Sequence, residues 1–153
     1  HMSRGRFNCK IDSKGRVKLP SAYRSHIEDI QQNFVVTNSQ YQNQKCLDAY
    51  LLQDWEKLEQ KISNLPGLNI EVQAFQRFYM ASGQLVEPDG QGRILIPHSL
   101  RNFSNIEGQA VLIGMGKKFE IWSEEVWNGL HQGMAENFEH ILNSVSQFEV
   151  GRS

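Results

Sequence analysis

The sequence predicts an α+β fold built from two tandem, pseudo-symmetric β-units with flanking helices. The main observation is a repeat, because the segment DSKGRVKLPSAYR at residues 12–24 returns as DGQGRILIPHSLR at residues 89–101. Both copies contain an Asp, a Gly followed by Arg, a Pro and a final Arg. An internal repeat of this kind indicates that each half of the 153-residue chain forms one structural unit.

The repeat extends beyond the two motifs. The same offset aligns residues 34–36 with residues 111–113, and an offset shorter by five residues then aligns Asp48 with Glu120. We attribute the five extra residues of the first half to a polar loop around NSQYQNQK. The predicted organisation is a first unit (2–66), a connecting helix (67–82), a second unit (83–145) and a C-terminal tail (146–153).

Each unit is predicted to contain strands joined by a tight turn. An Asp at the first position and a Gly at the fourth favour a type I turn, and a left-handed Gly there forms a G1 bulge. Asp12 and Gly15 hold these positions in the first unit, and Asp89 and Gly92 hold them in the second. The predicted strands are RFNCKID, RVKL, NFVVTN and CLDAYL in the first half and GQLVEP, RILI, AVLIG and FEIW in the second.

Helices are predicted to close each unit. Pro20 and Pro97 cannot donate to a strand ladder, and they fit the first turn of short helices with the sequences PSAYRSHI and PHSLRNF. Apolar residues at spacings of three and four predict a helix from Trp55 to Leu65, another within NIEVQAFQRFYMAS, and a long final helix after Ser123. The apolar face of the final helix continues for several turns and therefore needs a partner.

The net charge of −1 conceals an asymmetry along the chain. Residues 1–24 carry seven basic side chains and one acid, so the remaining residues carry an excess of acids. A basic arm on an acidic body favours a polyanionic partner such as nucleic acid, although a solvated charged hairpin would show the same pattern. The basic residues are Arg4, Arg6, Lys10, Lys14, Arg16, Lys18 and Arg24.

The composition excludes several other classes of protein. With 39% hydrophobic and 22% charged residues and no long apolar run, the chain is predicted to be a soluble, intracellular globular protein. No nucleophile, metal-ligand or phosphate-binding glycine pattern is present in the sequence, so we predict no enzyme, no cofactor and no metal site. We interpret Cys9 and Cys46 as reduced, buried thiols.

The two motifs DSKGRVKLP and DGQGRILIP, with RG near the start, LDAY followed by a Trp, and KFEIW, resemble the MraZ family of bacterial transcriptional regulators. The resemblance covers nearly the whole chain and implies two tandem AbrB-like swapped-hairpin units. It also implies a cytoplasmic, nucleoid-associated repressor that forms a ring of identical subunits. Such a protein binds direct repeats in double-stranded DNA upstream of its own cell-division and cell-wall operon, and it has no membrane partner or small-molecule substrate.

The Asp-x-x-x-Arg pair of the family falls on Asp12 and Arg16, and the matching pair of the second unit falls on Asp89 and Arg93. Because Arg16 follows a tight turn, its guanidinium can pair with a guanine edge or clamp a phosphate. Asp12 is better suited to fix the turn or to orient Arg16, since phosphate repels a carboxylate. The full predicted DNA-binding set is Arg16, Lys14, Lys18, Arg6, Lys10 and Arg4, with phosphate contacts expected from the residues around Arg16.

A structural alternative exists for these arginines. Each Arg after the Gly could pair with its own Asp and brace the turn, and we favour this role for Arg93 because its neighbours are acidic or apolar. Arg24 and Arg101 end the short helices, where they are expected to pair with carboxylates or helix carbonyls. The alternative function is a scaffold or antitoxin-like interaction module that does not bind DNA, which would have no need for a basic first hairpin.

Overall fold

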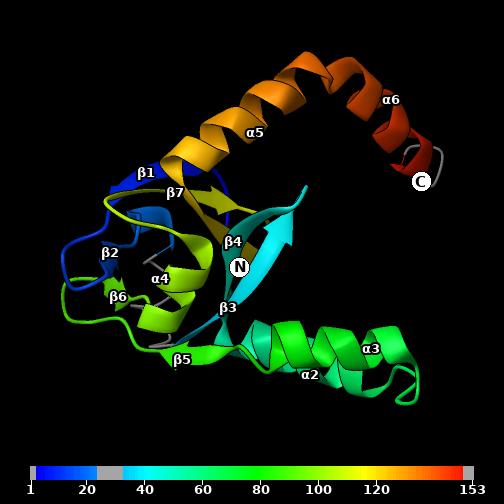
Figure 1. Cartoon of the computed structure of the whole chain (residues 1–153), viewed down its shortest axis with the longest axis horizontal. Coiled ribbons are helices and arrows are strands. Elements are labelled where there is room, and N and C mark those ends of the chain that lie inside the picture. The colour runs from blue at the N-terminus through cyan, green and yellow to red at the C-terminus, as the bar shows by residue number, and fades with distance from the viewer. Residues whose placement is uncertain (1–2, 24–32, 150–153) are drawn as a thin grey trace.

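A computed structural model describes residues 3–23 and 33–149 of the chain (Figure 1). Its strands confirm the predicted positions and are β1 (Arg6–Lys10), β2 (Arg16–Lys18), β3 (Phe34–Tyr41), β4 (Gln44–Leu51), β5 (Gln84–Val86), β6 (Arg93–Leu95), β7 (Gln109–Gly114) and β8 (Lys118–Ser123). The helices are α2 (Leu52–Ser63), α3 (Ile70–Phe75), the π-helical turn η1 (Gln76–Met80), α4 (His98–Ser104), α5 (Glu124–Glu136) and α6 (Phe138–Glu149).

The strands of the two sequence repeats are interleaved. A six-stranded antiparallel sheet has the order β1-β7-β8-β4-β3-β5, and β2 pairs with β6 in a separate two-stranded ribbon. Thus β1, β2 and β4 of the first half pair with β7, β6 and β8 of the second. Asp48 lies directly opposite Glu120, so the pseudo-twofold axis passes between β4 and β8. This arrangement confirms the α+β class with two swapped-hairpin repeats; the unit boundaries themselves stay a prediction.

Both faces of the six-stranded sheet are buried. One face packs against the ribbon and α4, through residues such as Val17, Ile94 and Phe119. The other face has two smaller clusters, one under α5 around Trp122 and one under α2 and η1 around Trp55. Because both faces are buried, several strands have continuous apolar sequences rather than alternating apolar and polar residues.

The cysteines only partly follow the prediction. Both are free thiols, and Cys46 is fully buried beneath α5. Cys9 is half-buried on β1, because this strand forms one edge of the sheet. The prediction that both thiols are buried was therefore wrong for Cys9.

The extra residues of the first half do not form the predicted polar loop. They lengthen β3 and β4, whose pairing runs without interruption from Phe34↔Leu51 to Tyr41↔Gln44. Gln42 and Asn43 connect the strands with positive φ angles of 51° and 62°. Two left-handed residues form a type I′ turn, which continues the right-handed strand twist, and the polar sequence therefore extends the hairpin.

The helices differ from the prediction at their ends. Helix α2 ends at Ser63, which leaves Leu65 outside it and exposed. Pro97 lies one residue before α4, at the N-cap, rather than in the first turn. The expected final helix is broken at Asn137, between α5 and α6, in a backbone conformation outside the helical region. Asn is a poor interior helix residue, and two glycines precede it in α5.

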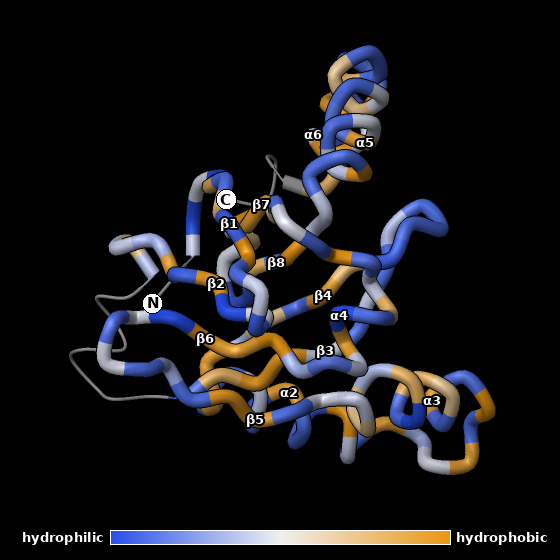
Figure 2. The backbone as a smooth tube through the Cα atoms, turned by 60° about the vertical axis from the view of Figure 1, so that its left-hand side comes forward, coloured by the Kyte–Doolittle hydropathy of each residue, from blue (hydrophilic) through white to orange (hydrophobic). Residues whose placement is uncertain are grey.

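Two helical arms extend from opposite ends of the sheet, α5–α6 toward the top of the view and α2–α3 toward the bottom (Figure 1). Both arms contain hydrophobic residues, whose positions along the backbone are coloured orange in Figure 2. Phe138 on α6 is 56% exposed, and Leu68 before α3 is 93% exposed. No helix within residues 3–23 and 33–149 is long and apolar enough to cross a membrane.

Candidate nucleic-acid interface

The β2–β6 ribbon has one buried face and one outward face. Val17 pairs with Ile94 at its centre, and both side chains are fully buried in the main core. Side chains alternate across a strand, so the flanking positions of both strands point away from this core. These outward positions are Arg16 and Lys18 on β2 and Arg93 and Leu95 on β6.

The ribbon brings cations from both repeats together. Lys18 lies directly opposite Arg93, and Arg16 lies opposite Leu95. Arg16, Lys18 and Arg93 therefore form one row, which we call the ribbon cations. We predicted the residues of each motif separately and did not predict that cations of the two repeats lie side by side. The repeat itself could have indicated this contact, since equivalent strands of two repeats pair with each other in an interleaved fold.

The first turn is held by the Asp12 side chain. Its Oδ1 accepts hydrogen bonds from the amides of Lys14 (3.0 Å) and Arg16 (2.9 Å), and its Oδ2 accepts from Nε of Arg16 at 2.7 Å. Gly15 has a φ of +93°, as the predicted turn requires. The hydrogen bond from the Arg16 amide, helped by the guanidinium and the Lys14 amide, lowers the pKa of Asp12 to about 2. Asp12 therefore fixes the turn and orients Arg16.

The second turn has the same arrangement of hydrogen bonds, with Asp89 in place of Asp12. Asp89 accepts from the amides of Gln91 (2.8 Å) and Arg93 (2.9 Å) and from Nε of Arg93 (2.8 Å), and Gly92 has a φ of +76°. The Arg93 amide is the main cause that lowers the pKa of Asp89. Each ion pair uses Nε of its arginine, which leaves both Nη nitrogens outside the pair. The bracing role expected for Arg93 is thus present at both arginines.

The strands flanking the first turn separate soon after it. Ile11 and Val17 form one isolated bridge, and β1 then joins the six-stranded sheet while β2 joins the ribbon. Lys10 is exposed at the end of β1 next to the turn, and Lys14 is exposed in the turn itself. The turn therefore adds Lys14 beside the ribbon cations, whereas Lys10 lies on the same face of β1 as Arg6 and Asn8, whose side chains bond to α5.

Arg101 has a different role from the predicted one. It lies in α4 and donates from Nε to the carbonyl of Ile96 at 3.0 Å, and its guanidinium covers Gly15 of the other repeat. A Cβ atom on Gly15 would lie 2.5 Å from the Arg101 guanidinium carbon. Arg101 therefore stabilises the first turn from outside, and within residues 3–23 and 33–149 its bonding partner is the Ile96 carbonyl rather than a carboxylate or a helix carbonyl. Arg24, its counterpart in the first repeat, lies outside the described residues.

The remaining predicted cations lie farther from the ribbon. Arg6 is at the opposite end of β1 from Lys10, about 13 Å away at the usual rise per residue. Its guanidinium lies 5.9 Å from the ring centre of Trp127 and donates to Oδ1 of Asn128 at 3.4 Å, which ties it to α5. The Arg4 backbone packs against Gly114. The structure therefore brings the ribbon cations and Lys14 together, and it holds Arg4, Arg6 and the side chain of Lys10 apart from them.

Comparison with known proteins gives consistent matches. The sequence profile of the family described as "MraZ protein, putative antitoxin-like" matches residues 2–78 and 80–148. A "Transcriptional regulator MraZ" from Natranaerobius thermophilus is 35% identical over 149 residues, and one from Caldanaerobacter subterraneus subsp. tengcongensis is 37% identical; each alignment covers 97% of this chain and 100% of the relative. A solution structure of PHS018 from Pyrococcus horikoshii covers 78% of this chain and 87% of its own, at 13% identity and a TM-score of 0.36, too low to bear on the fold.

Proposed function

This chain belongs to the MraZ family, and we propose that it is a transcriptional regulator that binds DNA through the outward face of its β2–β6 ribbon. The observation that carries the proposal is the row of ribbon cations, Arg16, Lys18 and Arg93, with Lys14 in the adjoining turn. In this proposal the protein represses its own cell-division and cell-wall operon by binding direct repeats. Both curated relatives bear the name transcriptional regulator, which supports the class of function.

The ribbon geometry suits the major groove of DNA, which admits a two-stranded β-ribbon. The Nη nitrogens of Arg16 and Arg93 can form paired hydrogen bonds with guanine or phosphate while Nε stays bonded to the turn Asp. Lys14 and Lys18 then contact phosphates and position the ribbon without reading sequence, and we assign Lys10 a smaller share because its face of β1 turns toward α5. Because Arg6 is engaged by α5, we assign Arg6, like Arg4, a smaller share of the phosphate contacts.

Self-association is the second part of the proposal, and the exposed apolar arms support it. On α6, Phe138, Leu142 and Val145 are all more than half exposed, and Leu68 and Ile70 at the α3 end are exposed further. Surfaces of this kind on soluble proteins usually mark protein contacts. Two different apolar faces at opposite ends of one chain suit a head-to-tail contact, which closes into a ring when the rotation allows it (Figure 1). A ring presents several ribbons to successive DNA repeats at high effective concentration.

The proposal is tested by measuring the affinity of the full chain for the DNA upstream of its own gene, against scrambled DNA of equal length, at two salt concentrations. Each phosphate contact lowers the slope of log affinity against log salt by about 0.9, so four cations per ribbon predict a slope of about −4 per subunit engaged. A complex that resists salt, or equal affinity for both DNAs, would contradict sequence-specific binding by these cations. A chain that assembles but binds neither DNA would instead support the scaffold or antitoxin-like alternative.

A further inference from the structure

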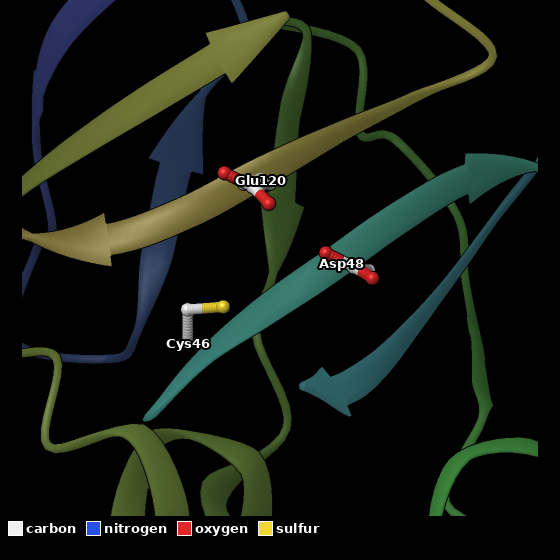
Figure 3. Close-up of side chains that lie close together, drawn as sticks. All are labelled: Cys46, Asp48 and Glu120. Atoms are coloured by element: carbon white, nitrogen blue, oxygen red, sulfur yellow. The ribbon is translucent and has the colours of Figure 1, made fainter. Parts of the chain in front are cut away.

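A buried polar cluster lies at the pseudo-twofold centre of the large sheet, on the face opposite the ribbon. Cys46 and Asp48 are two residues apart on β4 and share one face of the sheet, and Glu120 pairs with Asp48 from β8. Figure 3 shows the three side chains on the same side of the two strands. The thiol sulfur and one oxygen of each carboxylate all lie within 4.8 Å of one another. The DNA-binding proposal uses none of these residues.

The cluster departs from the symmetry of the repeat in one position. The offset that aligns Asp48 with Glu120 also aligns Cys46 with Lys118. Nζ of Lys118 lies 2.8 Å from Oδ2 of Asp48 and compensates that carboxylate. At the equivalent position on the other side of the pseudo-twofold axis, beside Glu120, the chain has Cys46 instead of a second lysine. The two facing carboxylates, Asp48 and Glu120, therefore have one cationic neighbour, the Lys118 ammonium group, and one thiol neighbour, Cys46, that can lose its proton.

One oxygen of the Asp48 carboxylate accepts no hydrogen bond from the described residues. Its side chain is fully buried, and Oδ2 accepts hydrogen bonds from Lys118 and from the Tyr79 hydroxyl. Among residues 3–23 and 33–149, no donor bonds its other oxygen, Oδ1. Buried carboxylate oxygens are rarely left without a partner, because the lost hydration is costly. Oε1 of Glu120 is satisfied by Nε1 of Trp122 at 2.9 Å, which orients that carboxylate within the cluster.

We propose that Cys46, Asp48 and Glu120 bind a divalent transition-metal ion of the zinc class, a site that the sequence motifs do not predict. A thiolate with two carboxylates favours a borderline-soft ion such as Zn²⁺ or Co²⁺ over Mg²⁺ or Ca²⁺, which prefer oxygen ligands alone. Three atoms that lie within 4.8 Å of one another leave a central point at most about 2.8 Å from each. Zinc bonds of roughly 2.0–2.3 Å then require each ligand atom to move by no more than about 0.5–0.8 Å.

Charge balance supports the same ion class. A thiolate, two carboxylates and the Lys118 ammonium group leave a net charge of −2, which one divalent cation neutralises. A neutral cluster can stay buried, whereas uncompensated charge there would oppose folding. The ion would also link β4 to β8, which belong to different repeats. Metal binding is therefore expected to raise the thermal stability of the chain.

The test titrates metal-free full-length protein with Co²⁺ and follows the thiolate-to-cobalt charge-transfer absorption. We expect one equivalent of Co²⁺ to produce this band and Zn²⁺ to remove it by displacement. Cys46→Ser should abolish the band, and Glu120→Gln should weaken Co²⁺ binding about tenfold or more. The matched control is Cys9→Ser, because Cys9 is a free thiol of β1 that packs against the opposite face of the sheet.

Three outcomes would overturn the proposal. They are a wild-type protein that gives no thiolate band, a band that survives Cys46→Ser, and a band that depends on Cys9. Circular dichroism establishes that each variant is folded before titration. If Cys46→Ser does not fold, the Glu120→Gln variant is used to test the site. A Co²⁺ affinity of Glu120→Gln equal to that of the wild type then refutes the site. Because the assay contains no DNA, its failure leaves the DNA-binding proposal untouched.

Discussion

Replacing Arg16 with Ala is expected to weaken binding to the upstream DNA while the chain stays folded. The fold should tolerate the change because Asp12 keeps its hydrogen bonds from two backbone amides. The lost ion pair is partly exposed, with side-chain exposures of 32% and 35%, and such pairs contribute at most about 1 kcal/mol. The melting temperature should therefore change little, and any large loss of affinity reports on the interface.

The size of the affinity loss depends on what Arg16 contacts. A paired contact with a guanine contributes about 1–3 kcal/mol of discrimination, which corresponds to about 5- to 150-fold weaker binding to the specific site. A phosphate contact would weaken specific and scrambled DNA equally and reduce the salt slope by about 0.9. Arg16→Lys separates these cases, since it keeps the charge but loses the planar donor fork. Fluorescence anisotropy with both DNAs at several salt concentrations measures each quantity.

Arg77→Ala is the matched control for this prediction. Arg77 is an exposed arginine of η1, a turn that packs on the sheet face opposite the ribbon. Its Nη1 donates a long hydrogen bond of 3.4 Å to Oε1 of Gln73. Its loss should leave DNA affinity and salt slope unchanged. The reasoning is refuted if Arg16→Ala binds the upstream DNA as tightly as the wild type, or if Arg77→Ala loses as much affinity.

Further predictions concern the second repeat, the turns and the arms. Arg93→Ala should weaken DNA binding less than loss of its first-repeat counterpart, and a larger loss in the same anisotropy assay would reverse that ranking. Gly15→Ala should lower the free energy of unfolding in urea by about 1–2 kcal/mol, because φ at Gly15 is +93° and the Arg101 guanidinium packs against it. Gly67→Ala is the control and should be nearly neutral, because Gly67 faces open space. Because the pKa of Asp12 falls from 3.8 to about 2 on folding, its contribution to stability is present above about pH 4 and disappears toward pH 2. Asp12→Asn should therefore flatten the dependence of urea unfolding on pH in that range, and an unchanged dependence would contradict its role. Phe138→Glu should shift the proposed oligomer toward monomer in light scattering, and an unchanged mass would exclude α6 from the proposed subunit contact.

The local chemistry of the turns could be predicted from the sequence because it depends on neighbouring residues. An Asp followed three residues later by Gly is enough to fix a type I turn with a left-handed residue, and both turns match this prediction. Strand positions followed from apolar runs for the same reason. The predicted loop around NSQYQNQK failed because Gln42 and Asn43 can adopt a type I′ turn, and polar composition alone does not distinguish a loop from an exposed hairpin.

Two equivalent units, their turns and the basic character of the first can be recognised from the residues alone. The pairing of the strands follows from the three-dimensional structure, because the repeat is compatible with two separate hairpins or with exchange between them. Exchange places Arg93 beside Lys18 and Arg101 on Gly15, contacts that join residues more than seventy positions apart. It also brings Asp48 opposite Glu120 at the axis. Such contacts depend on the free energy of the whole interleaved core, which no local pattern of residues encodes.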